Sequence, residues 1–286
     1  MFSRDRLILI GIFLIIFDFF VWSQIVLGGP NKNLEVYFLD VGQGDSQLVN
    51  LPSGVQVLID GGPNKKVLNE LSSVLAPTDR YIDLVILSHP QYDHFAGLIE
   101  VLKRYKVGAF IYNGREGEAK SFADLKKALK ENKIPEIILA GNDKIKYQDS
   151  RFDILSPTSD FLKSSELNDT TLVMKLGGLN SAADILFTGD IGKNVEDYLA
   201  KNFDIKADIL KVGHHGSKFS SGEEFLKKIG AKIAVIEVGK NNYGHPTVAA
   251  LNRLTSAGAR IFRTDNDGTI KLIINDRGMI NIFKNK

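Results

Sequence analysis

The chain has 286 residues, of which 44% are apolar, 9% aromatic and 24% charged, and this composition excludes a disordered, collagen-like or disulfide-stapled protein. The absence of cysteine excludes thiol catalysis, zinc fingers and iron–sulfur clusters, so histidine, carboxylate and amide side chains remain as metal ligands. The formal net charge of +2 is too small to indicate a nucleic-acid-binding domain by itself.

The N-terminal segment 7–27 is almost wholly apolar. At about 1.5 Å per residue, a helix of this length spans the roughly 30 Å hydrocarbon core of a bilayer. Arg4 and Arg6 precede it, which favours a cytoplasmic N-terminus, whereas Asp18 and Gln24 are unfavourable inside a membrane. The segment is therefore a candidate membrane span.

Three interpretations of this segment remain. A signal anchor is favoured because no small-residue cleavage site follows, and the alternatives are a cleaved secretory signal and a buried helix. The anchor predicts a membrane segment with its linker over residues 1–30 and a single domain over 31–286. That domain would lie outside the cytoplasm on a single-pass protein of the cell membrane, or would be secreted if the signal is cleaved.

After the linker, short strands separated by glycine and proline form a meander, and later strands alternate with helices. The pattern predicts strands at 34–41, 47–51, 55–60, 83–88, 108–112, 185–189, 207–213, 231–239 and 259–264, a hairpin over 268–284, and helices at 65–75, 95–105, 121–131, 192–202, 222–229 and 247–257. This order indicates an α+β fold with mixed sheets flanked by helices.

All five histidines follow strand-like runs in stretches rich in Gly, Pro, Asp or Ser, and none is expected on a helix: His89, His94, His214, His215 and His245. One such histidine is usually structural, but five in the same setting indicate a functional cluster at the end of a sheet. His89, Asp93 and His94 lie within six residues, and imidazole with carboxylate suits Zn²⁺, Mn²⁺ or Fe²⁺.

The stretch HPQYDH at 89–94 resembles the H-x-H-x-D-H motif of the metallo-β-lactamase superfamily, with Gln91 where the second histidine would stand. More narrowly, the chain from residue 34 onward resembles the C-terminal hydrolase domain of the competence protein ComEC. Seven blocks in order carry this resemblance: LDVGQGDS (39–46), LIDGG (58–62), SHPQYDH (88–94), NDTTLVM (168–174), FTGDI (187–191), LKVGHHGS (210–217) and VGKNNYGHP (238–246).

The resemblance implies a four-layer αβ/βα sandwich with a metal site at the edge where the two sheets meet. The implied ligands are His89, Asp93, His94 and Asp190, with Asp190 bridging if two metals bind. One of His214 and His215 would complete the site, and the other would orient substrate or a ligand.

Two departures from the motif concern the metal. Gln91 and Asn168 stand where typical two-zinc members have histidines, and neutral amides are weak ligands for Zn²⁺. The site would therefore hold one metal tightly or accept Mn²⁺, so one or two ions remain open. Asn168 has a second interpretation, an Asx turn before the next strand.

Further residues are predicted to support the site or to contact substrate. Asp60 would accept a hydrogen bond from a ligand histidine, and Asp45 would line the site or belong to a plain turn. His245 would lie at the rim as a ligand, proton donor or phosphate contact. Lys211, Ser217, Lys218, Lys240, Asn242 and Tyr243 would contact substrate, although isolated lysines are often only solvated.

The resemblance implies hydrolysis by a water that the metal activates to hydroxide, oriented by Asp93, with His215 and His245 as further catalytic candidates. The favoured substrate is a phosphodiester, DNA outside the membrane. The alternatives are a hydrolase of another exported ester, such as a phosphocholine ester or a lactone, and a DNA-binding module without turnover. No protein partner is indicated.

Overall fold

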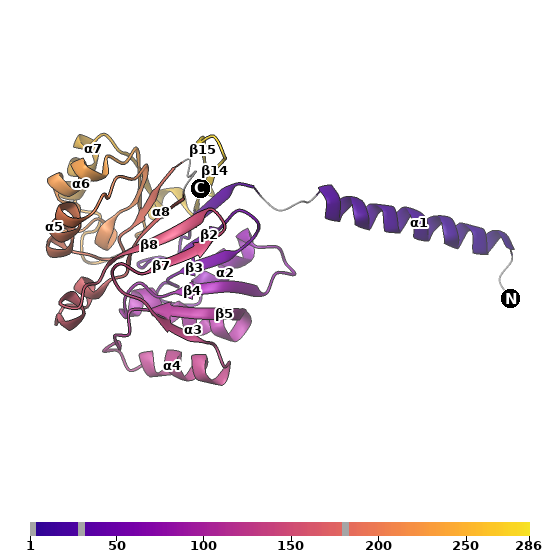
Figure 1. The fold of residues 1–286 in the computed structure, drawn as a ribbon, viewed down its shortest axis with the longest axis horizontal. Helices are drawn as coiled ribbons and strands as arrows, with labels where there is room; N and C mark the ends of the chain where they lie inside the picture. Colours follow the sequence, from indigo (N-terminus) through magenta and orange to yellow (C-terminus); the bar gives the residue numbers. More distant parts are fainter. Residues whose placement is uncertain (1–3, 28–31, 179–182) are drawn as a thin grey trace.

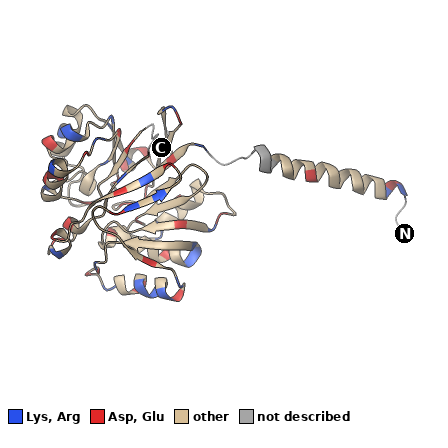
Figure 2. Ribbon diagram, viewed as in Figure 1, with Lys and Arg blue, Asp and Glu red and all other residues tan. Residues whose placement is uncertain are grey.

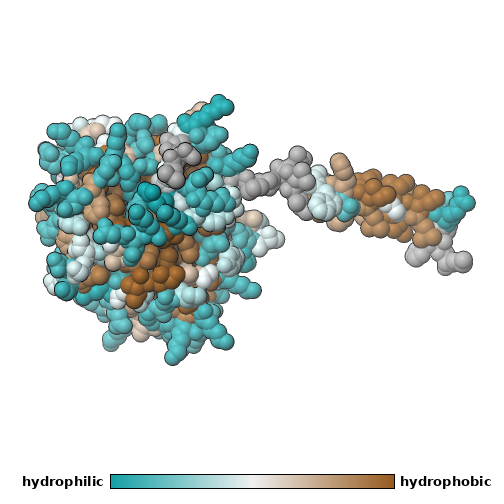
Figure 3. Space-filling model, viewed as in Figure 1, coloured by the Kyte–Doolittle hydropathy of each residue, from teal (hydrophilic) through white to brown (hydrophobic). Residues whose placement is uncertain are grey.

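The computed structural model describes residues 4–27, 32–178 and 183–286 (Figure 1). The chain begins with helix α1 (Arg4–Leu27), of which Arg4–Ser23 is long and apolar enough to cross a membrane. None of that span is buried against the described chain, which argues against a buried helix, and Figure 3 shows its apolar side chains on the surface. The predicted boundary between residues 30 and 31 lies outside the described residues.

The first sheet has eight strands in the order β15-β14-β1-β2-β3-β4-β5-β6. Its pairs are antiparallel from β15 to β3 and parallel from β3 to β6. The strands are β1 (Leu34–Phe38), β2 (Gln47–Asn50), β3 (Gln56–Ile59), β4 (Tyr81–Ile86), β5 (Lys106–Tyr112), β6 (Glu136–Ile138), β14 (Ile270–Ile274) and β15 (Ile280–Lys284).

The second sheet has seven strands in the order β13-β12-β11-β10-β9-β8-β7. It is also mixed, because β7 to β10 pair antiparallel and β10 to β13 pair parallel. The strands are β7 (Lys144–Tyr147), β8 (Ser150–Ser156), β9 (Val173–Gly178), β10 (Ile185–Phe187), β11 (Ile209–Lys211), β12 (Ile233–Ile236) and β13 (Arg260–Arg263).

Helices cover the outer face of each sheet, as Figure 1 shows. Those on the first sheet are α2 (Lys66–Val74), α3 (Tyr92–Arg104) and α4 (Phe122–Glu131), and those on the second are α5 (Lys193–Asn202), α6 (Glu223–Ile229) and α7 (Val248–Ser256). The short elements are η1 (Phe161–Lys163), η2 (Leu167–Thr170), η3 (Gly213–Gly216) and α8 (Thr264–Asp267).

The alternation of side chains along β1 shows how the layers are held together. Val36 and Phe38 belong to the apolar cluster between the sheets, whereas Tyr37 and Leu39 belong to the cluster under α2, α3 and α4. Because successive strand residues point to opposite faces, one strand contributes to both cores. The expected four-layer α+β sandwich is therefore confirmed.

Two sequence-based expectations differ from the structure. Strands β6, β7 and β8 were not predicted. Strand β6 is exposed and β7 alternates exposed with half-buried residues, so these two lack the apolar pattern of a buried strand. Helix α3 begins at Tyr92 rather than residue 95, so His94 lies on a helix, contrary to the expectation that no histidine would. Figure 2 shows acidic and basic residues intermingled on the visible face of the domain, with no large patch of one sign there.

Candidate metal centre

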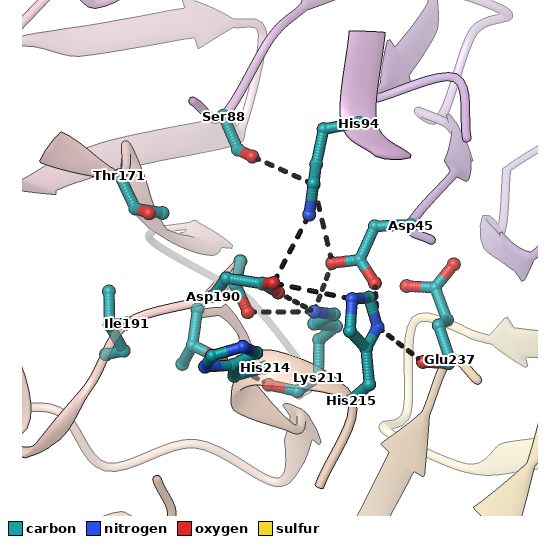
Figure 4. Close-up of polar contacts among 12 residues, drawn as sticks. Asp45, Ser88, His94, Thr171, Asp190, Ile191, Lys211, His214, His215 and Glu237 are labelled. Atoms are coloured by element: carbon teal, nitrogen blue, oxygen red, sulfur yellow. Dashed lines mark hydrogen bonds and ion pairs between the residues drawn. The ribbon is translucent and has the colours of Figure 1, made fainter. Parts of the chain in front are cut away.

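The loops at one end of the two sheets bring together most of the residues singled out in the sequence. Asp45 follows β1, Asp60 follows β3 and His89 follows β4 in the first sheet, while Asp190 follows β10 and His215 follows β11 in the second. Figure 4 shows Asp45, His94, Asp190, Lys211 and His215 directed toward one another across the junction of the sheets. The carboxyl ends of these strands therefore meet at a single site.

Four side chains form a compact group of possible metal ligands: Asp93, His94, Asp190 and His215. His94 Nε2 lies 3.4 Å from Asp190 Oδ2, and His215 Nε2 lies 3.4 Å from both Asp190 Oδ2 and Asp93 Oδ2. His94, Asp190 and His215 are buried, and the Asp93 side chain is 31% exposed. The group thus opens to solvent on the Asp93 side.

Helix α3 carries two members of the group. Its N-terminus at Tyr92 places Asp93 and His94 in the first turn, beside the loop after β1. Gly44 in that loop allows this approach, because a Cβ there would lie 2.3 Å from the Asp93 carbonyl oxygen, and the Asp45 amide donates to the same oxygen at 3.3 Å.

Asp60 fixes the orientation of His94. The His94 Nδ1–H donates to Asp60 Oδ2 at 2.8 Å, which turns Nε2 toward Asp190. Ser88 holds Asp60 in turn, through its amide to Oδ1 at 2.8 Å and its hydroxyl to Oδ2 at 2.7 Å. A carboxylate behind a histidine in this way sets the tautomer in which Nε2 is free to bind a metal.

The two adjacent histidines 214 and 215 point in different directions. Both have left-handed backbone angles, with φ of 49° and 51°, a conformation that is strained for residues other than glycine. The His215 Nδ1–H donates to the Glu237 carbonyl oxygen at 2.8 Å, so its Nε2 faces Asp93 and Asp190. The His214 ring instead lies 5.5 Å from the His245 ring.

Asp190 follows a glycine that the packing requires. Gly189 has φ of 47°, and a Cβ there would lie 2.5 Å from Thr171 Cγ2. The tight turn after β10 therefore sets Asp190 between the two histidines, with its second oxygen, Oδ1, 3.7 Å from Lys211 Nζ.

The pKa values reflect the density of carboxylates. Burial lowers the pKa of His94 and of His215, but the surrounding carboxylates, of which Asp190 has the largest effect, together outweigh it and raise both pKa values well above their ordinary value. For Asp93, burial is outweighed by the hydrogen bond from His215 and the charge on His94, and its pKa is lowered to about 2. The group therefore favours positive charge at its centre.

The residues of this group suit a divalent cation. His94 Nε2, His215 Nε2 and Asp190 Oδ1 are buried and make no hydrogen bond within the described part of the chain. Two atoms that each lie about 2.1 Å from a tetrahedral Zn²⁺ are roughly 3.4 Å apart, which matches the three distances above. Two imidazoles with two carboxylates also suit Mn²⁺ and Fe²⁺.

Behind the group lies a buried set of charged residues, of which the sequence analysis did not single out Glu237. The Lys211 ammonium pairs with Asp45 and donates to the Gly189 carbonyl oxygen at 2.8 Å, and its side chain is 1% exposed. Glu237, which lay inside a predicted strand, accepts from the Ser46 amide at 2.9 Å and from the Gln47 side chain. Burial and the Asp45 charge raise the Glu237 pKa well above its ordinary value.

Two expectations are corrected by this burial. Lys211 cannot reach a substrate phosphate, because it is enclosed and paired with Asp45. Ser217 is also buried, and its hydroxyl accepts a hydrogen bond from the Phe219 amide at 3.3 Å within its own turn. Their neighbours Lys218, Lys240, Asn242 and Tyr243 are exposed.

The remaining predicted residues lie around the group of four without joining it. The buried His89 ring packs 4.1 Å from the His94 ring, burial lowers its pKa to about 3, and its Nε2 has no partner among the described residues. Gln91 precedes α3. Asn168 lies in η2 rather than in an Asx turn, and its Nδ2 atom is 3.4 Å from Nδ1 of His214. His245 is half-buried at the rim.

Comparisons with known proteins point to one superfamily. Residues 39–160 match the family model of the metallo-β-lactamase superfamily. The chain is also similar to the structure of YhfI from Bacillus subtilis, a metallo-β-lactamase fold protein, with a TM-score of 0.58 and 12% identity over 84% of this chain and 100% of that one. At this identity the likeness concerns the fold.

Two curated relatives are much longer than this chain, and one of them is a competence protein. ComE operon protein 3 of Bacillus subtilis is 35% identical over 83% of this chain and 32% of its own length. Competence protein ComA of Neisseria gonorrhoeae is 27% identical over 87% of this chain and 35% of its own length. The chain thus spans about a third of the length of these relatives.

Proposed function

Because the chain belongs to the metallo-β-lactamase superfamily, whose fold implies a divalent metal, we propose that this metal-dependent hydrolase cleaves the phosphodiester bonds of DNA. The observation that carries the proposal is the group Asp93, His94, Asp190 and His215, with its buried, unpartnered ligand atoms. The similarity to a competence protein supports DNA as the substrate.

In this proposal the four residues of the group hold one Zn²⁺ or Mn²⁺. When bound there, the cation would supply Lewis-acid chemistry that lowers the pKa of water and stabilises charge on the phosphoryl oxygens. Asp60 and the Glu237 carbonyl keep the two histidines in the tautomer with Nε2 facing inward. The geometry of the site is therefore fixed before substrate arrives.

Asp93 would orient the attacking water. It is the member of the group with solvent access, at 31% exposed, and it lies on the open side. Its pKa of about 2 keeps it ionised at neutral pH, so it accepts a hydrogen bond from water. His215 would contribute through its Nε2 atom, which lies 3.4 Å from carboxylate oxygens of both Asp93 and Asp190.

His245 and His214 would contact the scissile phosphate or donate a proton to the leaving oxygen. They stand ring to ring at 5.5 Å on the rim, and the His245 Nδ1 atom is buried without a partner in the described residues. Residues in this position reach substrate after it has entered the site.

The apolar helix and the similarity to a competence protein suggest membrane association. We propose further that α1 anchors the chain with the domain outside the cytoplasm, since Arg4 and Arg6 lie at the N-terminal end of the span.

The test is hydrolysis of fluorescent single- and double-stranded DNA by the full chain in detergent, with Mn²⁺, Zn²⁺ and Mg²⁺ in separate assays. Asp190→Asn should lower the rate at least about a hundredfold, because it removes the negative charge of the proposed metal ligand that lies between His94 and His215. Asp197→Asn, on the exposed side of α5, is the matched control.

Two outcomes would contradict the proposal: metal-loaded wild type that cuts neither DNA, or equal rates for wild type and Asp190→Asn. Hydrolysis of p-nitrophenylphosphocholine without hydrolysis of DNA would assign the site to a different phosphodiester.

A further inference from the structure

Two large aromatic side chains project into solvent from the loops that follow β11 and β12. Tyr243 is 75% exposed and Phe219 is 70% exposed. Phe219 lies four residues after His215, and Tyr243 lies two residues before His245. Single exposed rings are ordinary on a protein surface, but these two lie on the loops that carry the site histidines.

A series of ring contacts connects His215 of the candidate metal centre to Tyr243. The ring centroids of His215 and His214 are 6.2 Å apart, those of His214 and His245 are 5.5 Å apart, and those of His245 and Tyr243 are 5.8 Å apart. The first two pairs meet edge to face, at 73° and 79°, whereas the His245 and Tyr243 rings are inclined by only 32°. Ring contacts thus connect the candidate centre to the exposed face.

The loop that carries Phe219 is held from both sides. The Glu196 carboxylate accepts from the Ser221 amide and from the Gly222 amide at 2.9 Å. Arg253 donates to the carbonyl oxygens of Lys218, Ser220 and Ser221, at 3.2, 2.7 and 2.7 Å. The exposed ring therefore stands on a fixed backbone, which reduces the ordering cost of binding.

The loop that carries Tyr243 is fixed in the same way. The Asn241 side chain accepts from the amides of Tyr243 and His245, at 3.0 and 3.1 Å, and donates to the His245 carbonyl at 2.8 Å. The two loops are joined, because the Thr247 amide donates to the Gly216 carbonyl at 2.9 Å. They form one continuous rim.

Positive charge accompanies the rings. Lys218 Nζ lies 5.0 Å from the centre of the Phe219 ring, and Lys240 is exposed at the start of the other loop. A ligand that combines anionic phosphates with flat rings matches this arrangement. A quaternary ammonium group matches it poorly, because the Lys218 ammonium already lies over the Phe219 ring and repels a second cation.

We propose that Phe219 and Tyr243 form a stacking surface for unpaired bases, so that the nucleic acid presented to the centre is single-stranded; this inference rests on the proposed function. Aromatic side chains stack on any base whose face is free, and lysines contact the phosphates between them. In a duplex the base faces are covered by their neighbours, so the two rings have nothing to stack on.

The test measures binding without cleavage. Fluorescence anisotropy follows the full chain in detergent and EDTA as it binds a labelled single-stranded oligonucleotide, its duplex, or the same strand with abasic sites. Wild type should bind the single strand at least about tenfold more tightly than the duplex or abasic strand. Phe219→Ala and Tyr243→Ala should each weaken single-strand binding by about tenfold.

The controls are matched by residue type. Tyr81→Ala and Phe283→Ala remove rings that are 48% and 52% exposed and lie outside the two loops, and they should leave binding unchanged. Tyr243→Phe and Phe219→Tyr keep a ring face and should bind like wild type.

Several results would overturn the inference: no measurable binding, equal affinity for single strand and duplex, alanine variants no weaker than the controls, or displacement of the strand by phosphocholine but not by inorganic phosphate. Hydrolysis is scored separately with Mn²⁺. A wild type that prefers single strands but cuts no DNA would refute the proposed function and leave the stacking surface supported.

Discussion

The ammonium group of Lys211 lies against the carboxylate of Asp45, and solvent reaches neither side chain. Burial opposes both charges, but each charge stabilises the other. The Asp45 charge raises the Lys211 pKa, and the Lys211 charge lowers the Asp45 pKa. The pair joins the loop after β1 in one sheet to β11 in the other. It therefore links the two halves of the fold directly behind the candidate centre.

Removing one partner of this pair should be strongly destabilising. Lys211→Met leaves the Asp45 carboxylate buried without its cation, and we expect the free energy of unfolding to fall by about 3–5 kcal/mol. Asp45→Leu combined with Lys211→Met should recover part of the loss, since no buried charge of the pair then remains.

Urea unfolding followed by circular dichroism measures this effect. The single tryptophan, Trp22, lies in α1 and does not report on the domain. Lys193→Met, which breaks an exposed pair with Asp197, is the control and should cost under about 1 kcal/mol. Equal stability of Lys211→Met and wild type would contradict the account of the pair.

Asp93→Ala should lose most of the bound metal while the domain stays folded. Asp93 is the partly exposed member of the group and lies outside the apolar clusters, so the loss of its carboxylate affects the metal more than the core. Elemental analysis after gel filtration gives the metal content, and circular dichroism verifies the fold. A folded Asp93→Ala protein with wild-type metal content would show that Asp93 is not a ligand.

The wild-type chain should bind close to one Zn²⁺ at micromolar free metal and show higher phosphodiesterase activity with Mn²⁺. Gln91 and Asn168 supply only neutral amides where two-zinc members of the superfamily have histidines, and neutral amides are weak ligands for Zn²⁺. Gln91→His with Asn168→His should raise the stoichiometry toward two, measured by native mass spectrometry. Two tightly held Zn²⁺ ions in wild type would instead point to His214 and His245 as additional ligands.

The domain should be accessible from outside the cell. Arg4 and Arg6 at the N-terminal end of the apolar span predict export of the residues that follow it. A protease added to intact cells expressing the full chain should degrade the domain, as seen by immunoblot against its C-terminal end. Protection of the domain, with a cytoplasmic marker also intact, would reverse the proposed orientation.

The sequence predicted the layers and most site residues because short motifs at strand ends carry them. The resemblance of these motifs to a known family implied a site at one edge of the sandwich, and Asp60, Asp93 and Asp190 all lie close to strand ends there. The choice between His214 and His215 was not predictable, since it depends on left-handed backbone angles and on a hydrogen bond to the Glu237 carbonyl.

The pairings of the buried residues behind the site could not be predicted from sequence patterns. Glu237 looked like one residue of an apolar strand, and its partners Ser46 and Gln47 lie about 190 positions earlier. Lys211 looked like a surface lysine near a loop, but it pairs with Asp45 from the other sheet. Such pairings depend on how the sheets face each other, which neither periodicity nor spacing encodes.

Strand β1 also separates the point where the chain enters the domain from the candidate centre. It starts at Leu34, where the chain arrives from α1, and runs toward Asp45 and the candidate centre. Its five residues span roughly 17 Å, so the point of attachment and the centre lie at opposite poles of the sheet. If α1 anchors the chain as proposed, the anchor joins the domain at the end of β1 that lies away from the candidate centre. A long polymer arriving from the surrounding medium would reach it without passing beneath the protein.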